Sequence, residues 1–225
     1  MFVHLNLHSI YSAMRGLLSL SDIVKLAKSV SMNRIALTDI NGVWGIIKFI
    51  QHCSCAGIKP IVGSNIITDK EEVLILVENQ YGYENLCKII SKIHDNPNHD
   101  ISDILKKYNL GVFVLAHSQE LLRKIYIFIP NTHLFIELRP GINELFAKRL
   151  SKELKLEIIA TGDVYFKQRS DYKSHKILNA IYHNMTLQEL DQTQYKSDQH
   201  WFRNEKQMIN LFPNSLEALN NSQYL

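Results

Sequence analysis

Short apolar segments of strand length alternate with segments of helical periodicity along most of this chain. Val73–Val77, for example, is five apolar residues in a row, which is typical of a strand buried on both faces. Because parallel neighbours in a sheet need crossover connections, this alternation predicts an α/β fold with a mainly parallel sheet of about seven strands. No glycine-rich turn follows the first strand, which argues against a dinucleotide-binding fold and favours a barrel of βα units. The predicted strands are Val3–His8, Arg34–Thr38, Lys59–Ile67, Val73–Val77, Gly111–Leu115, His133–Leu138 and Glu157–Thr161.

Capping residues mark several helix boundaries. Ser21 is placed to cap a helix that ends at Ser29. Gly57 provides a C-terminal stop for the helix Val43–Cys55, and Ser118 caps a helix that ends at Lys124. The remaining predicted helices are Tyr83–His94, Ile101–Tyr108, Asn143–Leu154, Asp171–Tyr182, Glu205–Asn210 and Ser215–Asn221.

Composition places the chain among globular proteins of the cytoplasm. At 225 residues, with 46% hydrophobic and 21% charged residues, it is long enough to bury a sizeable core. The net charge of +3 is too small to argue for nucleic-acid binding by itself. Three cysteines provide no disulfide framework and fit a reducing compartment. We expect no signal peptide, because the N-terminus lacks a basic region and a continuous apolar stretch after it. We also expect no membrane span, because no apolar run approaches the roughly 20 residues that a span requires.

Polar side chains stand at the ends of the predicted strands. Strand alternation places His4, Asn6 and His8 on one face of the first strand, where apolar residues would otherwise be expected. In a βα barrel the carboxyl ends of the strands form the active site. The polar residues at these strand ends therefore predict a site at the mouth of the barrel. They are His8, Asp39, Asn65, His117, Glu137 and Asp163.

Several sequence motifs resemble the PHP (polymerase and histidinol phosphatase) domain at the N-terminus of the bacterial family C DNA polymerases, the DNA polymerase III alpha subunits. The string Gly-Ile-Lys-Pro-Ile-Val-Gly is the most specific of them. The tail from Trp201 to Pro213 is similar to the segment that links this domain to the polymerase core. The other matching stretches are Phe2–Ser12, Gly16–Ser19, Ile35–Asp39, Gly57–Gly63 and Ala160–Tyr165.

The resemblance implies a distorted seven-stranded βα barrel that holds up to three metal ions at its mouth. Carried over by position, His8, Asp39 and Asp163 match metal ligands of the family. Asn6 stands where the His-x-His motif has its first histidine, and Ile40 stands where Asp-His is expected. An isoleucine donates no lone pair, and a neutral amide is a weak substitute for an imidazole.

Further departures weaken the implied metal centre. Asn65 replaces an acidic ligand, Ser118 replaces a thiolate or similar ligand, and Tyr165 replaces the last histidine, while His117 is displaced by one residue. A catalytic metal needs at least three good protein ligands and an open position for water. We therefore expect no cofactor. The alternative is one residual zinc or manganese ion held by His8, Asp39 and Asp163; without it, these residues would form a hydrogen-bonded polar cluster.

The resemblance also implies a domain division and a function. Residues 1–185 are predicted to form the PHP-type barrel, and residues 186–225 an extension that leads toward a polymerase core absent from this chain. The expected role is structural support of a DNA polymerase in DNA replication, without polymerase activity of its own. The implied partners are the polymerase core domains of the same parent chain and a proofreading or clamp subunit, with DNA bound only through the parent protein. Two rival functions are an active metal-dependent phosphoesterase or 3′–5′ exonuclease, and a scaffold with no polymerase in the same chain.

Overall fold

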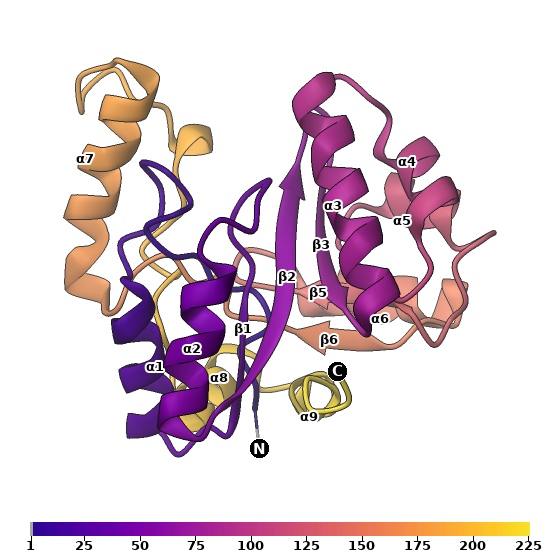
Figure 1. Cartoon of the computed structure of the whole chain (residues 1–225), viewed down its shortest axis with the longest axis horizontal. Helices are drawn as coiled ribbons and strands as arrows, with labels where there is room; N and C mark the ends of the chain where they lie inside the picture. Colours follow the sequence, from indigo (N-terminus) through magenta and orange to yellow (C-terminus); the bar gives the residue numbers. More distant parts are fainter. Residues whose placement is uncertain (1) are drawn as a thin grey trace.

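Six strands form one curled sheet in which the spatial order follows the order along the chain (Figure 1). The structure, a computed structural model, describes residues 2–225, with all side chains but that of Gln192. β3 runs antiparallel to both of its neighbours, and the other three neighbouring pairs are parallel. The strands are β1 (Arg34–Leu37), β2 (Lys59–Ile67), β3 (Glu72–Val77), β4 (Val112–Ala116), β5 (Leu134–Leu138) and β6 (Ile158–Ala160).

The direction of β3 departs from the fully parallel arrangement of βα units. Only residues 68–71 separate the end of β2 from the start of β3. A connection this short joins antiparallel strands, because a parallel crossover needs a dozen or more residues. The register pairs Gly63 with Leu76 and Ile67 with Glu72. The positions of β2 and β3 along the chain agree with the prediction. Their antiparallel direction does not follow the expected βα pattern, and the short loop between them is the sequence feature that indicates it.

The opening segment, predicted as the strand Val3–His8, is extended but does not form a regular strand. On one side, the Thr38 N–H donates to the Leu7 carbonyl oxygen at 2.9 Å. On the other side, the His8 N–H donates to the Val164 carbonyl oxygen at 2.8 Å. The Leu7 N–H donates to Thr38 Oγ1 at 2.8 Å instead of to a strand carbonyl, which interrupts the ladder. The described residues thus form an α/β fold with a six-stranded curled half-barrel sheet, and the seventh strand of the expected barrel stays a prediction.

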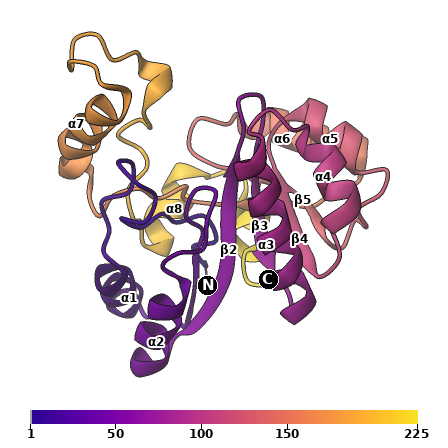
Figure 2. The same cartoon turned by 45° about the horizontal axis from the view of Figure 1, so that its top comes forward.

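Helices cover the outer face of the curled sheet, with α1 and α2 near β1 and α3 to α6 near β3 to β5 (Figures 1 and 2). α7 stands apart from the sheet on the side of the N-terminal loops (Figure 2). The first six helices are α1 (Leu20–Ser29), α2 (Ile46–Ala56), α3 (Gln80–Asp95), α4 (Ile101–Tyr108), α5 (Gln119–Ile125) and α6 (Glu144–Leu154). The remaining ones are η1 (Arg169–Asp171), α7 (Tyr172–His183), η2 (Gln192–Gln194), α8 (Glu205–Leu211) and α9 (Leu216–Asn221).

Two of the three predicted helix caps are confirmed. Ser118 accepts a hydrogen bond from the Leu121 N–H at 3.3 Å, at the start of α5. Gly57 ends α2 in a left-handed conformation with φ 70°, which glycine adopts without steric cost. The prediction for Ser21 is wrong, since α1 begins one residue earlier and is capped by Ser19.

The inner face of the sheet changes from apolar to polar along the strands. Deep in the curl, buried aliphatic and aromatic side chains form one cluster, with Phe135, Ile159 and Leu74 among its members. Two residues further along the parallel strands, the same face carries polar side chains, because strand residues alternate between faces. These buried side chains at the mouth are Thr38, Asn65, Glu137 and Thr161.

Residues 186–225 pack onto the barrel core. Phe202 and Met208 are buried in the main hydrophobic cluster, and Leu225 joins the cluster inside the curl. Ser222 Oγ accepts a hydrogen bond from the Val3 N–H at 3.0 Å, so the two ends of the chain are in contact. The division at residue 185 stays a prediction, and Met1 of the predicted barrel lies outside the described residues. Among residues 2–225, none of the helices combines the length and the apolar character needed to cross a membrane.

Candidate functional site

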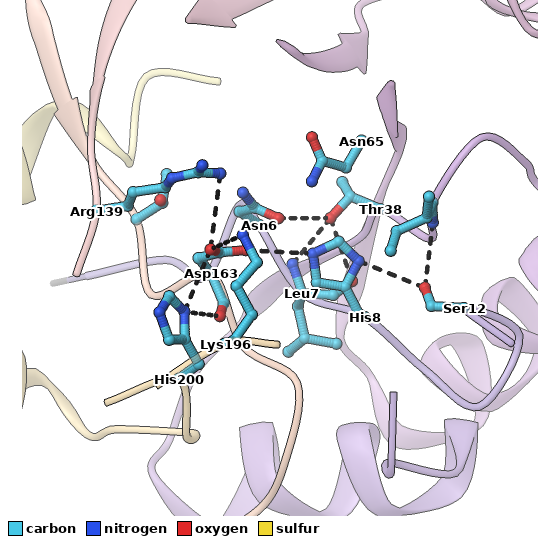
Figure 3. Close-up of polar contacts among 12 residues, drawn as sticks. Asn6, Leu7, His8, Ser12, Thr38, Asn65, Arg139, Asp163, Lys196 and His200 are labelled. Atoms are coloured by element: carbon cyan, nitrogen blue, oxygen red, sulfur yellow. Dashed lines mark hydrogen bonds and ion pairs between the residues drawn. The ribbon is translucent and has the colours of Figure 1, made fainter. Parts of the chain in front are cut away.

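A polar cluster occupies the mouth of the curled sheet, and Asp163 lies at its centre (Figure 3). Asp163 follows β6 in a left-handed backbone conformation with φ 43°, and its side chain is fully buried. Its Oδ2 lies 3.0 Å from Lys196 Nζ, 3.2 Å from His200 Nδ1 and 3.6 Å from Arg139 Nη1. Its Oδ1 lies 3.4 Å from His8 Nε2. One buried carboxylate therefore contacts two cationic side chains and two imidazoles.

The charges around Asp163 keep it ionised. Burial by itself raises the pKa of a carboxyl group, because the charged form loses its hydration. Here the positive charges of Lys196 and Arg139, with His200, outweigh burial and hold the pKa of Asp163 well below its usual range. The site thus contains a fixed negative charge whose neutralising partners are side chains of the same protein.

Arg139, at the end of β5, forms a second group of ion pairs. Its guanidinium donates two hydrogen bonds of 2.6 Å to the two carboxylate oxygens of Glu72, on β3. It also lies 3.8 Å from Glu137 Oε2. Burial lowers the pKa of Arg139, but Asp163, Glu72 and Glu137 together raise it well above its usual value. Burial likewise raises the pKa of Glu72, and the charges of Lys196 and Arg139 outweigh it, so the Glu72 pKa is lowered. Both groups are charged.

Glu137, also on β5, accepts two hydrogen bonds and lies close to an imidazole. Its Oε1 accepts from Asn6 Nδ2 at 2.8 Å and from Thr161 Oγ1 at 2.7 Å. Its Oε2 lies 3.7 Å from His117 Nδ1. Burial raises the pKa of Glu137, but His117 and the charge of Arg139 more than offset it, and the pKa is lowered. A carboxylate in this state is a poor general acid, because it holds no proton near neutral pH.

Asp39, at the end of β1, fastens the loop that follows the opening segment. It accepts from the Ser9 N–H at 2.7 Å, from Ser9 Oγ at 2.8 Å and from Ser12 Oγ at 2.7 Å. Ser12 Oγ is also 3.4 Å from His8 Nδ1. The three predicted ligands His8, Asp39 and Asp163 are thus connected through contacts, but both oxygens of Asp39 are engaged by hydroxyl and amide donors.

The residues that depart from the family's ligand pattern are built into the same cluster. Asn6 donates to Glu137, and Asn65 Nδ2 donates to Glu72 Oε1 at 2.7 Å. Tyr165 stacks on the His8 ring with 4.1 Å between ring centroids. Ser118 caps α5 and donates to Glu71 Oε1 at 3.1 Å, and Ile40 forms a backbone bridge with Asn65.

Comparison with known proteins assigns the family. Residues 4–125, more than half of the chain, match the PHP domain family. The chain belongs to the PHP domain family. This range covers the opening segment, β1 to β4 and the helices between them, so it contains His8 and Asp39 but not Asp163.

This PHP domain is homologous along its length to the N-terminal region of DNA polymerase III alpha subunits. It is 32% identical to the DNA polymerase III subunit alpha of Escherichia coli (strain K12), over 98% of this chain and 22% of that protein. It is 28% identical to the corresponding subunit of Pasteurella multocida (strain Pm70), with the same coverage of both chains. The chain therefore spans about a fifth of the length of these curated relatives.

A solved structure shares the fold of this PHP domain. A protein from Bifidobacterium adolescentis, described as a candidate metal-dependent phosphoesterase, superposes with a TM-score of 0.50 at 12% identity. The match covers 72% of this chain and 86% of that one. At this identity the likeness concerns the fold.

The donor set of this PHP domain does not fit the metal centre that the family resemblance implies. Among residues 2–225, no three His, Cys, Asp or Glu side chains are grouped as a metal ion would need. Asp163 faces Lys196 and Arg139 where a ligand would face a cation, and both oxygens of Asp39 are already engaged. Two cationic side chains beside these carboxylates would repel a divalent ion.

Sequence reasoning missed Lys196, His200 and Glu72 as members of this site. Glu72 begins β3, whose antiparallel direction places its first residue at the mouth beside Asn65 of β2. Lys196 and His200 follow Asp163 by more than thirty residues, in a polar stretch without a motif. The short loop before β3 was the available signal for Glu72. For the other two there was none.

Proposed function

We propose that this PHP domain is a supporting domain of a bacterial family C DNA polymerase, in which internal ion pairs replace the metal centre. Homology along the chain to DNA polymerase III alpha subunits supports the polymerase context. The observation that carries the loss of hydrolysis is the engagement of the buried Asp163 carboxylate by Lys196 and Arg139. In this family's chemistry a bound metal would lower the pKa of a water molecule and so supply the hydroxide that attacks a phosphoester at neutral pH.

In this proposal the domain keeps the architecture of a closed barrel. The opening segment 3–8 acts as the seventh strand, because it makes backbone hydrogen bonds both to β1 and to the segment after β6. The other domains of the parent chain, and a proofreading or clamp subunit, are the partners, and DNA is bound through the parent protein. The location is the cytoplasm, where replication takes place.

Metal content and phosphodiesterase activity test the proposal together. The chain would be expressed in medium supplemented with zinc and manganese, purified, and measured for bound metal by mass spectrometry. We expect no stoichiometric metal, no effect of a chelator on the thermal midpoint, and no hydrolysis of a chromogenic phosphodiester above that of an Asp163→Asn variant. One tightly bound ion together with chelator-sensitive hydrolysis would instead establish the rival phosphoesterase function.

A further inference from the structure

The buried carboxylates at the mouth outnumber the permanent cations that reach them. The side chains of Glu72, Glu137 and Asp163 are at most 17% exposed to solvent. Arg139 contacts all three of them. One guanidinium does not neutralise three charges, and a buried charge without a partner is strongly destabilising. The cluster therefore requires at least one further cation.

Lys196 supplies that cation from a distant part of the chain. Its Nζ lies 3.0 Å from Asp163 Oδ2, 3.6 Å from Glu72 Oε1 and 5.4 Å from the centroid of the Tyr165 ring. This single ammonium group thus contacts two carboxylates and one aromatic face. Groups of these kinds also surround cations bound to proteins. The side chain is 24% exposed, so the charge is partly shielded from water.

The backbone on both sides of Lys196 is fixed to the barrel. The Lys196 N–H donates to His175 Nε2 at 3.2 Å, and His175 Nδ1 in turn donates to the Arg15 carbonyl oxygen at 2.8 Å. Four residues later, His200 Nδ1 donates to the Asp163 carbonyl oxygen at 2.9 Å. These hydrogen bonds therefore hold the ammonium group of Lys196 at a defined position beside the barrel.

Other atoms around this position have no hydrogen-bond partner. Asp163 Oδ1 and His8 Nε2 are buried and make no hydrogen bond, their one polar contact being with each other at 3.4 Å, and Asn65 Oδ1 is also buried without a hydrogen bond. Oxygen and imidazole nitrogen atoms of this kind are ligands for divalent cations. A cavity of about 230 Å³, lined by Lys196, Glu72 and Tyr165 among others, lies against the same side chains. Shortening Lys196 would therefore leave acidic groups beside a cavity that has room for an ion and its water.

We propose that Lys196 is the resident cation of this mouth, a tethered side chain that takes the place of a bound metal ion and excludes one. Its removal leaves a vacant cation site at Asp163 and Glu72, which a divalent ion in solution fills. This inference rests on the metal-free mouth of the proposed function, but it concerns which residue keeps the mouth free of metal.

The test compares Mn²⁺ binding by the wild-type chain, Lys196→Ala and Lys196→Met, using electron paramagnetic resonance of free Mn²⁺ and thermal unfolding. Both variants should unfold at a midpoint lower by roughly 5–10 °C without divalent ions, because a buried ion pair has lost one partner. Millimolar Mn²⁺ should bind with one-to-one stoichiometry to Lys196→Ala and raise its midpoint, and should do neither for the wild-type chain. The control Lys173→Ala removes an exposed lysine of α7 and should behave as the wild type.

Two further variants separate the outcomes. Lys196→Arg keeps the charge and should bind no Mn²⁺, whereas adding Asp163→Asn to Lys196→Ala should abolish the gained binding. If the lysine variants are recovered unfolded, Mn²⁺ added during refolding should restore the folded state of Lys196→Ala. Absence of both binding and rescue would overturn the inference while leaving the proposed function intact. Stoichiometric metal in the wild-type chain would overturn both.

Discussion

His4 provides a sharp test of the packing around the opening segment. Its ring is fully buried between Phe2, whose ring centroid is 4.8 Å away, and Phe202, at 4.4 Å. Its Nε2 donates to the Arg203 carbonyl oxygen at 2.8 Å, while its Nδ1 is buried without a partner. Protonation would place a second N–H in this apolar site with no acceptor. Burial therefore lowers the pKa of His4 to about 4, although the bond to Arg203 partly opposes the shift.

The sign of the pH dependence follows from this shift. In the unfolded chain a histidine takes up a proton near pH 6.5, whereas folded His4 does so near pH 4. Above about pH 7 neither state is protonated and His4 contributes no pH dependence. As the pH falls below 6.5, the unfolded state binds the proton first, so the free energy of unfolding decreases. From about pH 7.5 to about pH 4.5 the loss due to His4 is roughly 2–3 kcal/mol.

Urea unfolding at a series of pH values measures this loss. Carboxylates with lowered pKa values also destabilise the protein in acid, so the quantity to compare is the difference between variants at each pH. His4→Gln removes the titration and should be less stable than the wild type at neutral pH but lose roughly 2–3 kcal/mol less on acidification. His52→Gln, on the exposed face of α2, is the matched control and should follow the wild type. Parallel pH profiles for wild type and His4→Gln would refute the reasoning.

Three further substitutions test other parts of the structure by urea unfolding. Gly82→Ala should cost roughly 3 kcal/mol or more, because a Cβ there would lie 1.7 Å from the Gly111 carbonyl oxygen, whereas Gly57→Ala meets no atom and should cost only about 1 kcal/mol for its left-handed backbone. Equal losses for the two glycines would contradict this packing. Asp39→Asn should cost about 2–3 kcal/mol, because it loses charge-assisted bonds from the loop of residues 9–12; a change below measurement error would show that the loop is held otherwise. Tyr165→Phe should be neutral or stabilising by about 1 kcal/mol, since the hydroxyl is buried without a partner; a clear loss of stability would reveal a partner for this hydroxyl.

Local patterns predicted most of the secondary structure. Short apolar segments located all six strands to within a few residues, and the caps at Ser118 and Gly57 were predicted from their residue types. These features depend on backbone sterics and on hydrogen bonds within a few residues, so they are visible in a short window of sequence. The same reasoning failed for the opening segment, where the Thr38 hydroxyl, thirty-one residues from Leu7, accepts a bond that a regular strand would have made elsewhere.

The sequence alone predicted several of the acidic and imidazole side chains at the mouth, because the apolar pattern locates strand ends and parallel strands bring their carboxyl ends together; it did not predict Glu72 or His200. His8, Glu137 and Asp163 all take part in the cluster in this way. Only the tertiary structure decided what neutralises them. Lys196 lies in a segment that has neither hydrophobic periodicity nor a recognisable motif. Its position beside Asp163 depends on contacts with His175 and Asp163 that form only when the chain is folded. Ion pairs between residues far apart in the chain leave no trace in local sequence, since charge acts through space and not along the backbone.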